Sequence, residues 1–405
     1  MNDYDIVIAG GGMIGSSLAL ALAPLSLRIA LVEAVARDDV LQPSFDDRST
    51  ALSRSSQRMF EAMGLWDEIA AAATPIRHIH VSERGRFGFA HLDAEEQQVE
   101  ALGYIVVNRV LGQVLQRALG GAEGLDVRCP ARVAGVDTSR EGVVVRLDGS
   151  AELTCRLLVA ADGADSGVRR LLGIEAARID YGQSAVIGNV RPEIPPAGRA
   201  WERFLETGVL ALLPFGDERV AFVWTMPAEE AARVAGAPDE EFCERLREAF
   251  GNRLGRFTRV GERRTYPLAL TKAKRIVARR AVLAGNAAHG LHPVAAQGFN
   301  LGLRDVAALS DCIADALHAG GPRAIGAPAM LSRYADWRRP DHRKVVGFTD
   351  GLVRLFADRR PGMGVMRSFG MLGFDLVPGV RALFARHTMG LAGKLPRLAR
   401  GVPLT

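Results

Sequence analysis

The sequence is poor in cysteine and in aromatic residues, and it has no long uninterrupted apolar run. It contains four cysteines in 405 residues, and phenylalanine, tyrosine and tryptophan together make up 6%. The cysteines stand far apart with no C-x-x-C pair, which argues against a disulfide framework or a cysteine zinc site and favours reduced intracellular thiols. Because charge or glycine interrupts every run of about 18 apolar residues, we predict no transmembrane helix.

The amino-terminal start also lacks the features of an export signal. Residues 1–5 (MNDYD) are acidic and lead directly into an apolar segment, without a basic region or a small-residue cleavage pattern. We therefore predict no signal peptide.

The overall composition is that of an ordinary globular protein, with 48% hydrophobic and 24% charged residues. It excludes a disordered or collagen-like chain, and the length suggests two or three domains or one large α/β body with an inserted layer. Glycine is the exception, with 44 residues in the chain. This excess indicates tight turns and close backbone approaches, as around a cofactor.

A glycine-rich motif lies directly after the first apolar segment. Residues 5–9 (DIVIA) predict a buried strand, and G-x-G-x-x-G then opens a helix at Gly10, Gly12 and Gly15. Gly10 permits a tight turn, Gly12 lets the backbone approach a pyrophosphate, and Gly15 lets the helix pack on the strand. Glu33 ends a second apolar strand, where a carboxylate can hydrogen-bond an adenosine ribose. The spacing predicts a dinucleotide site and leaves FAD and NAD both open.

The rest of the pattern divides into parallel and antiparallel parts. Apolar strands at 157–161 and 281–284 suit a parallel sheet, whereas residues 184–226 read as an antiparallel meander between them. We therefore predict an α/β fold in which a discontinuous dinucleotide-binding domain holds an inserted sheet. Helices are expected over 13–23, 53–63, 107–119, from 238 and over 297–318, further strands over 28–33 and 143–147, and a basic helical region from 336 onward.

Positive charge is concentrated in the last part of the chain. From Arg333 to Arg400 there are 14 Lys and Arg against 5 Asp and Glu, or +9, so the remainder carries +5 − 9 = −4. Such a basic end suits nucleic acid, an anionic membrane surface, or simply a solvated helical face. Charge alone leaves these three open.

Two later motifs, Asp162-Gly163 and Gly285-Asn286, each follow an apolar strand, and G-F-N-L-G-L-R-D begins at Gly298. These segments resemble the motifs of the class A flavoprotein aromatic hydroxylases (aromatic monooxygenases). In detail these segments are similar to the FAD-dependent ubiquinone-biosynthesis hydroxylases of the 2-polyprenyl-6-methoxyphenol hydroxylase group. The resemblance spans nearly the whole chain. It implies a Rossmann-like FAD-binding domain with an inserted antiparallel-sheet substrate domain and a C-terminal helical region.

The resemblance also implies FAD as the cofactor. Gly285-Asn286 corresponds to the motif that contacts the flavin ribitol, and the helix that begins near Gly298 would direct its N-terminus at the flavin ring and stabilise negative charge there. Arg48 and Arg109 are assigned to flavin contacts, although either could instead form a surface ion pair. The residues expected to bind the cofactor are Gly10, Gly12, Gly15, Glu33, Arg48, Arg109, Asp162, Gly163, Gly285, Asn286, Gln297, Gly298, Phe299 and Asn300.

His292 and Pro293 are the expected catalytic residues at the flavin-side wall, with a hydrogen-bonded loop histidine as the alternative for His292. Neither His289 nor His292 has a carboxylate or histidine at ligand spacing, so no metal set is predicted. Apolar residues of the sheet are expected to line the substrate cavity, with simple sheet packing as the alternative. They are Leu213, Pro214, Phe215 and Trp224.

Domain boundaries follow from the same resemblance. We expect the FAD-binding domain over residues 1–77, 100–180 and 265–345, the substrate-binding sheet domain over 78–99 and 181–264, and the basic helical region over 346–405.

The implied activity is hydroxylation of the aromatic ring of a polyprenyl phenol in ubiquinone biosynthesis, with 2-polyprenyl-6-methoxyphenol as first choice. NAD(P)H is expected as a transient co-substrate beside O2, because the chain has only one G-x-G-x-x-G. A sister hydroxylase of different regiospecificity stays open, as does a soluble hydroxylase of aromatic degradation. A non-catalytic flavin-binding subunit of the biosynthetic complex also stays open, because Asn286 and Ala296 depart from the family pattern.

A polyprenyl substrate would lie in a bilayer, which gives the basic C-terminus a partner. We expect a cytoplasmic protein that contacts the inner face of the membrane, or other ubiquinone-biosynthesis proteins, through this region rather than nucleic acid. Apolar residues stand there beside the arginines: Leu352, Leu355, Phe356, Leu372, Phe374, Leu383 and Phe384.

Overall fold

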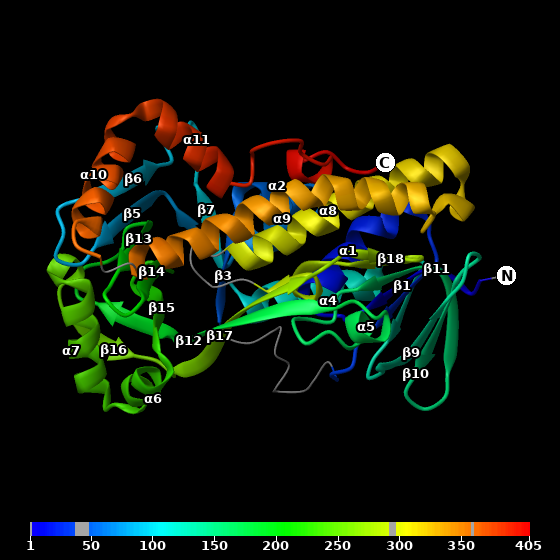
Figure 1. Ribbon diagram of the computed structural model, residues 1–405, viewed down its shortest axis with the longest axis horizontal. Helices are drawn as coiled ribbons and strands as arrows, with labels where there is room; N and C mark the ends of the chain where they lie inside the picture. Colours follow the sequence, from blue (N-terminus) through cyan, green and yellow to red (C-terminus); the bar gives the residue numbers. More distant parts are fainter. Residues whose placement is uncertain (1, 37–47, 291–296, 358–359) are drawn as a thin grey trace.

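The protein is built from three β-sheets and eleven α-helices in the part of the chain that its computed structural model describes, residues 2–36, 48–290, 297–357 and 360–405. In Figure 1 one large sheet lies at the end with the N-terminus and the second large sheet at the opposite end. Two long helices, α8 (Gln297–Gly320) and α9 (Pro328–Ala357), run side by side along the molecule and connect the two ends.

The first sheet has eight strands around a parallel centre. Strand β1 pairs in parallel with β2 and β11, and β19 continues the parallel set beyond β11. Five of the six residues of β1 are buried, as expected for a strand that is covered on both faces. The strands are β1 (Tyr4–Ala9), β2 (Ile29–Val32), β8 (Leu125–Arg128), β9 (Val133–Thr138), β10 (Val143–Leu147), β11 (Glu152–Ala160), β18 (Val277–Ala278) and β19 (Ala281–Leu283).

The two faces of this sheet are covered differently. Ile6 and Ile8 point to a face where α1, α4 and α8 pack, whereas Val7 and Ala9 point to a face covered by the β9–β10 hairpin and α5. This alternation follows from the two-residue period of a strand. The helices of this half are α1 (Met13–Leu22), α2 (Arg54–Ala62), α3 (Trp66–Ala70), α4 (Asn108–Gly121) and α5 (Gly167–Leu171).

The second sheet has nine strands and is mainly antiparallel. Helices α6 (Ala228–Gly236) and α7 (Asp239–Phe250) cover one of its faces, where Phe222 and Trp224 pack with Phe242. Its strands are β5 (His78–Glu83), β6 (Phe89–Asp93), β12 (Ala176–Pro192), β13 (Arg199–Phe204), β14 (Val209–Phe215), β15 (Arg219–Pro227), β16 (Phe257–Val260), β17 (Arg264–Ala273) and β20 (His289–Gly290).

The other face of the second sheet looks toward the C-terminal helices. The end of α9 approaches this face, and α10 (Met363–Leu376) and α11 (Pro378–Thr388) lie over strands β5 and β6 (Figure 1). A small third sheet of β3 (Ser49–Ser53), β7 (Gly103–Val107) and β4 (Thr74–Ile76) lies between the two large sheets.

Among the described helices, none alone has the length and hydropathy needed to cross a bilayer. Helix α10 and residues 379–388 of α11 reach that length only when they are counted together, and they meet at 96°.

The predicted fold class, an α/β fold with an inserted antiparallel sheet and a helical C-terminal region, is confirmed. The helical region begins earlier than the expected residue 336, at Pro328, because proline suits the first position of a helix. The domain boundaries stay predictions. Residues 176–180 and 269–273, which we expected in the FAD-binding domain, pair with each other inside the nine-stranded sheet.

A fully buried carboxylate on α8 connects the third sequence motif to α9. Asp305 Oδ2 accepts hydrogen bonds from the Gly285 N–H at 3.0 Å and from His289 Nε2 at 2.8 Å. Asp305 Oδ1 accepts from Arg338 Nε at 2.6 Å and from His342 Nε2 at 2.7 Å. Both carboxylate oxygens are therefore occupied, and the turn at Gly285 is held against two helices.

The charges around Asp305 set its protonation state. Burial alone would raise the pKa of Asp305, but attraction to His342, Arg338 and His289 outweighs burial and holds this pKa well below 3.8. Ligand-type atoms of His289, Asp305 and His342 lie within 4.8 Å of one another. The Arg338 guanidinium bonds the same carboxylate and would repel a cation, so we interpret the group as a hydrogen-bond network.

Replacing Asp305 with asparagine is expected to lower the free energy of unfolding by about 3 kcal/mol, because the buried Arg338 loses a charged partner. The folded-state pKa of Asp305 lies below its unfolded value, so the carboxylate contributes fully above about pH 4. Denaturant unfolding at several pH values should give a constant difference from the unmodified protein above that pH, and a smaller difference below it.

The control for this substitution is Asp336→Asn, which breaks an exposed ion pair with Arg339 on the same helix. It should change the free energy of unfolding by less than about 0.5 kcal/mol. A loss for Asp305→Asn no larger than that of the control would contradict the structural role of the carboxylate.

Candidate cofactor and substrate site

The three sequence motifs meet around one cavity of about 1120 Å³. The cavity lies at the carboxyl ends of β1, β2 and β11, where α/β folds bind ligands. Ten of the residues that we expected to bind the cofactor line it: Gly10, Gly12, Glu33, Arg48, Asp162, Gly163, Gly285, Asn286, Gly298 and Phe299.

The turn after β1 has no room for side chains. Gly10 has φ +101°, and a Cβ added there would lie 2.5 Å from the Ala161 carbonyl oxygen. A Cβ at Gly15 would lie 1.8 Å from the Gly10 carbonyl oxygen, so only glycine lets α1 start this close to the strand. Gly12 precedes α1 and has no side chain to cap it, which leaves the first N–H groups of the helix available to an anion.

Glu33 lies opposite this helix start, at the end of β2. Its Oε2 accepts a hydrogen bond from the Gly11 N–H at 2.6 Å, and its Oε1 accepts from the Val35 N–H at 2.8 Å. These bonds fix the carboxylate at the cavity wall. Its remaining lone pairs can accept hydrogen bonds from ribose hydroxyls.

The second motif is organised by its own aspartate. Asp162 Oδ2 accepts a hydrogen bond from the Val168 N–H at 3.0 Å, and the same carboxylate accepts from the Ser166 hydroxyl at the start of α5. Arg169 then donates to the Ala287 carbonyl oxygen at 3.0 Å. The loop of the second motif is therefore bonded to the loop of the third.

The third motif approaches α1 closely. Gly285 has φ +59°, and a Cβ there would lie 3.0 Å from Ile14 Cγ1. A Cβ at Gly302 of α8 would lie 2.7 Å from Ile14 Cδ1. Small residues thus bring α8 and the Gly285 turn onto the first turn of α1.

The residues present fit FAD. The helix start and its glycine cradle suit a pyrophosphate, Glu33 suits the adenosine ribose, and Asn286 and the first turn of α8 line the continuation of the same cavity. A cavity that extends this far from the phosphate cradle suits a flavin dinucleotide.

Four of the residues that we expected to bind FAD are not brought to this cavity. Gly15 packs α1 on the turn, and Arg109 is exposed on α4, where its neighbour Asn108 lines the cavity instead. Gln297 lines the adjoining cavity described below. Asn300 accepts hydrogen bonds from the Ser53 N–H and the Ser56 hydroxyl, both at 2.8 Å, so it ties α8 to the third sheet.

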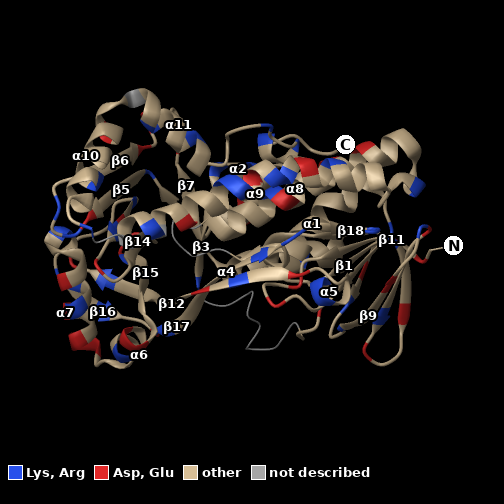
Figure 2. Ribbon diagram, in the orientation of Figure 1, with Lys and Arg blue, Asp and Glu red and all other residues tan. Residues whose placement is uncertain are grey.

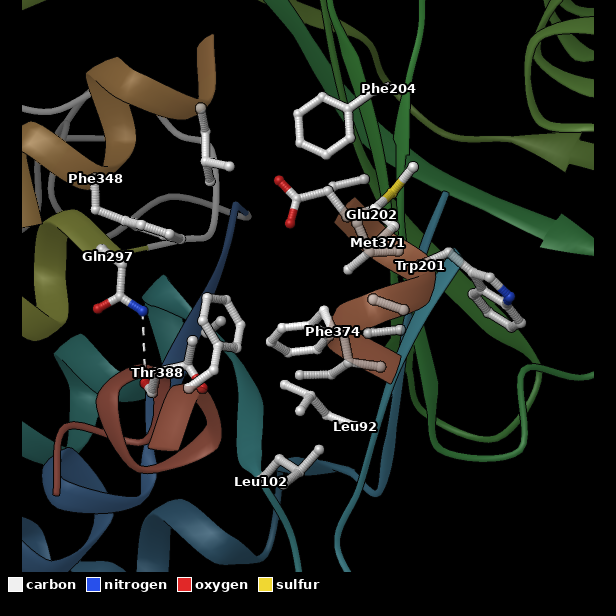
Figure 3. A pocket seen from close by; sticks show the side chains of 18 of the residues that line it. Leu92, Leu102, Trp201, Glu202, Phe204, Gln297, Phe348, Met371, Phe374 and Thr388 are labelled. Atoms are coloured by element: carbon white, nitrogen blue, oxygen red, sulfur yellow. Dashed lines mark hydrogen bonds between the residues drawn. The ribbon is translucent and has the colours of Figure 1, made fainter. Parts of the chain in front are cut away.

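A second cavity of about 510 Å³ adjoins the first and is almost entirely apolar. It lies between the second sheet and the C-terminal helices (Figure 3). The two cavities share the wall residues Ala51, Leu213 and Val223. Side chains that close the second cavity include Ile76, Leu92, Leu102, Phe204, Phe348, Met371, Phe374 and Phe384.

The sheet places one row of side chains along both cavities. Strand pairing aligns Glu202 of β13 with Ala211 of β14, and Ala211 with Val223 of β15. The row leads from Glu202, in the second cavity, to Val223, which lines both. Two strand spacings of about 4.8 Å separate these two backbones, so Glu202 lies roughly 10 Å from the shared wall.

Few polar groups face the apolar cavity. Glu202 points into it, and Gln297 Nε2 donates a hydrogen bond of 3.5 Å to the Thr388 carbonyl oxygen (Figure 3). The Gln297 Oε1 atom is buried without a hydrogen-bond partner among the described residues. Arg367 also lines the cavity, and its charge is paired with Glu83 at 2.6 Å.

Of the residues expected to line the substrate cavity, the structure brings only Leu213 to it. Phe215 packs with Ile76 beside the cavity and stacks with Arg219. Trp224 and Pro214 are buried on the opposite side of the sheet, where Trp224 packs against Phe242. Their side chains alternate with those of Leu213 and Val223, so they point away from both cavities.

The C-terminal wall of the apolar cavity was missed by sequence reasoning. The sequence predicts a membrane contact for Leu352, Phe356, Phe374 and Phe384, whereas in the structure all four line this cavity. His292 and Pro293, the expected catalytic residues, lie outside the described residues.

Comparisons with known proteins agree with this geometry. Residues 3–349 match the family model described as an FAD binding domain. The chain is 37% identical over 403 residues to ubiquinone hydroxylase UbiL of Rhodospirillum rubrum. The matched region covers 99% of this chain and 93% of UbiL. It is 30% identical to 3-demethoxyubiquinol 3-hydroxylase of Escherichia coli over 391 residues, covering 96% of this chain and 98% of that enzyme.

A solved structure supports the same conclusion. PqsL of Pseudomonas aeruginosa, crystallised in complex with 2-aminobenzoylacetate, matches with a TM-score of 0.75 and 25% identity, over 90% of this chain and 99% of PqsL. The chain therefore belongs to the FAD binding domain family, as an FAD-dependent monooxygenase of the group that includes the ubiquinone hydroxylases.

Proposed function

We propose that the protein hydroxylates the aromatic ring of a polyprenyl phenol in ubiquinone biosynthesis, with 2-polyprenyl-6-methoxyphenol as the first candidate. The observation that carries the proposal is the apolar cavity that shares Ala51, Leu213 and Val223 with the cofactor cavity. A ring placed at this shared wall would touch the cofactor, and an apolar substituent would fill the space behind it.

The two cavities suggest separate roles for the cofactor and for the protein's own residues. When bound, FAD supplies the electrons and the activation of O2 for transfer of one oxygen atom to the ring. The protein holds the cofactor at the phosphate cradle and at Glu33, and it keeps water from the ring through walls such as Ile76 and Phe374. Among the polar residues that line this cavity, Glu202 and Gln297 could orient a phenol hydroxyl.

The apolar cavity favours a prenylated phenol over a small soluble one. Its volume of about 510 Å³ lies within the usual range for ligand sites, and the side chains deeper in it are Leu92, Leu102 and Met371. A free phenol would leave these walls without apolar contact. The relatives named as ubiquinone hydroxylases support the same substrate class.

Three parts of the proposal rest on the sequence and the family alone. NAD(P)H is proposed as the transient reductant because the chain has a single G-x-G-x-x-G. The ring position that is hydroxylated stays open between C1 and the position that a sister hydroxylase would modify. Contact with other ubiquinone-biosynthesis proteins and a location at the cytoplasmic face of the membrane stay proposals as well.

A product assay tests the reaction. The protein reconstituted with FAD is expected to oxidise NAD(P)H faster when a 2-polyprenyl-6-methoxyphenol is present, and to release a product that carries one oxygen atom from oxygen-18 gas. Mass spectrometry measures the label, and NMR of the product gives the ring position. NAD(P)H consumption without labelled product for any prenylated phenol would contradict the proposal and favour the non-catalytic subunit.

Replacing Glu33 with glutamine is expected to weaken FAD binding by roughly 10–100-fold, because a hydrogen bond to a charged acceptor contributes about 1.5–3 kcal/mol. Quenching of FAD fluorescence during titration of the flavin-free protein measures the affinity. Glu123→Gln, at an exposed glutamate after α4, is the control and should leave the affinity unchanged. Equal affinities for both variants would remove Glu33 from the cofactor site.

The apolar cavity can be filled from α10. Gly370 lines the cavity, and nothing lies within 4 Å of a Cβ added there. Gly370→Leu is expected to reduce kcat/KM for a prenylated phenol by roughly tenfold or more and to leave that for the same ring without a tail nearly unchanged. Steady-state kinetics with both substrates measures the two ratios.

Gly373→Leu is the matched control, because Gly373 is exposed on the outer face of the same helix and also has open space at its Cβ position. It should behave like the unmodified protein with both substrates. Equal losses for the two substrates in Gly370→Leu would show that the cavity does not hold the tail.

A further inference from the structure

Helix α10 is apolar on two opposite sides. Its inner side faces the second sheet, where Met371 and Phe374 line the apolar cavity. Its outer side carries Val365, Phe369 and Leu376, which fall on one face at helical spacing and are 46%, 60% and 69% exposed. A surface helix of a soluble protein normally turns polar residues outward, so the outer face of α10 indicates a binding surface.

Both charged residues of α10 are held by the body of the protein. Arg367 pairs with Glu83 of β5 at 2.6 Å, and both side chains are nearly buried. Asp375 Oδ1 accepts a hydrogen bond from the His91 N–H of β6 at 2.8 Å. No charged side chain of α10 is therefore left for its outer face.

Further exposed apolar residues lie on the elements next to α10. Ten of the fourteen large apolar side chains that are exposed in the described residues lie on the end of α9, on α10 and α11 or at Val377 between them, or on β6 and the turn before it. Phe87 lies in that turn, and its ring packs edge-on against the Phe369 ring, with the two ring centroids 5.6 Å apart. In Figure 2 the ribbons of α10 and α11 are mostly tan, with few charged segments. We define the apolar patch as Phe87, Met366, Phe369, Leu376, Val380 and Leu383.

Basic residues surround the apolar patch. Residues 360–388 contain four Arg and one Asp, a net charge of 4 − 1 = +3. Arg84 and Arg86 are exposed beside Phe87, and the Arg86 guanidinium lies against Gly364 at the start of α10. Arg386 is exposed on α11. A basic rim around an apolar centre matches anionic headgroups around acyl chains.

The patch also reaches the apolar cavity. Met366 is 66% exposed and at the same time lines the cavity, so the two apolar surfaces meet at its side chain. Helices α10 and α11 each pack one side against the protein, so only their outer faces are available to lipid. This arrangement favours a helix pair that lies parallel to the bilayer surface. Protein interfaces normally carry about one hydrogen bond per 100–200 Å², whereas α10 offers no charged group outward.

We propose that the apolar patch docks on an anionic lipid bilayer, with α10 and α11 embedded at the level of the headgroups and the upper acyl chains. A substrate tail then passes between the lipid and the apolar cavity beside Met366, so that the reacting ring never crosses water. The docking itself stands on the patch and its basic rim, and the passage of the tail rests on the proposed function.

Vesicle sedimentation tests the docking. The FAD-loaded protein is expected to sediment with vesicles of phosphatidylcholine and phosphatidylglycerol, to bind pure phosphatidylcholine more weakly, and to lose affinity as salt is raised. The combined variant Phe369→Ser with Leu376→Ser should bind more than tenfold more weakly, and so should Val380→Ser with Leu383→Ser. Ile194→Ser, at an apolar residue that is 51% exposed away from the patch, should bind like the unmodified protein.

The variants also separate docking from catalysis. None of their four residues lines either cavity, so FAD content and turnover of a water-soluble short-tailed phenol should stay unchanged. Turnover of a long-tailed phenol supplied in vesicles should fall with the loss of binding. If vesicle binding persists in the unmodified protein but no phenol is turned over, the docking stands and the proposed function fails.

Two results would overturn the docking. One is an unmodified protein that stays in the supernatant at all vesicle concentrations. The other is a serine variant that binds vesicles normally but changes from an oligomer to a monomer in analytical ultracentrifugation, because the patch would then cover a second copy of the chain.

Discussion

Packing that leaves no space for a Cβ brings the three distant motifs together. Gly15 meets the Gly10 carbonyl oxygen, and Gly285 and Gly302 both meet the side chain of Ile14. These contacts place the first turn of α1 against segments nearly 300 residues away in sequence. Only then do Glu33, the Asp162 loop and the start of α8 line one cavity. The excess of glycine is thus a requirement of the cofactor site, because a methyl group at Gly15 would separate α1 from the strand that positions it.

Motifs of this kind are predictable from sequence because each is local. A buried strand, a glycine turn and a helix start occupy about 20 consecutive residues, and their geometry is fixed by backbone sterics. The partners that hold the motifs are not local. Asp305 bonds the Gly285 N–H and also Arg338 on another helix, and Asn300 bonds Ser53 at the end of β3. Sequence assigned Asn300 to the cofactor because it lies in a motif, whereas the fold uses it to attach α8 to the third sheet.

The residues expected to line the substrate cavity show a different limit of prediction from sequence. Residues 213 and 214 are neighbours in sequence but point to opposite faces of β14, so a prediction of the strand does not identify the face that meets the cofactor. That choice depends on where α6 and α7 pack, because they cover the face of the sheet on which Trp224 meets Phe242. The row from Glu202 to Val223 follows from strand register, and register between β13, β14 and β15 was not readable from the alternation alone.

From the sequence, the apolar and basic residues of the C-terminal helices are expected to contact a membrane. In the structure, their apolar residues face two different surfaces. Phe374 and Phe384 turn inward to line the apolar cavity, whereas Phe369 and Leu383 turn outward. An apolar outer face is unfavourable in water, and its retention on a helix whose inner face forms a ligand cavity is explained if both faces serve one substrate. The proposed lipid-soluble tail would supply that reason, since a wall that received it from a bilayer would have to be compatible with hydrocarbon on both sides.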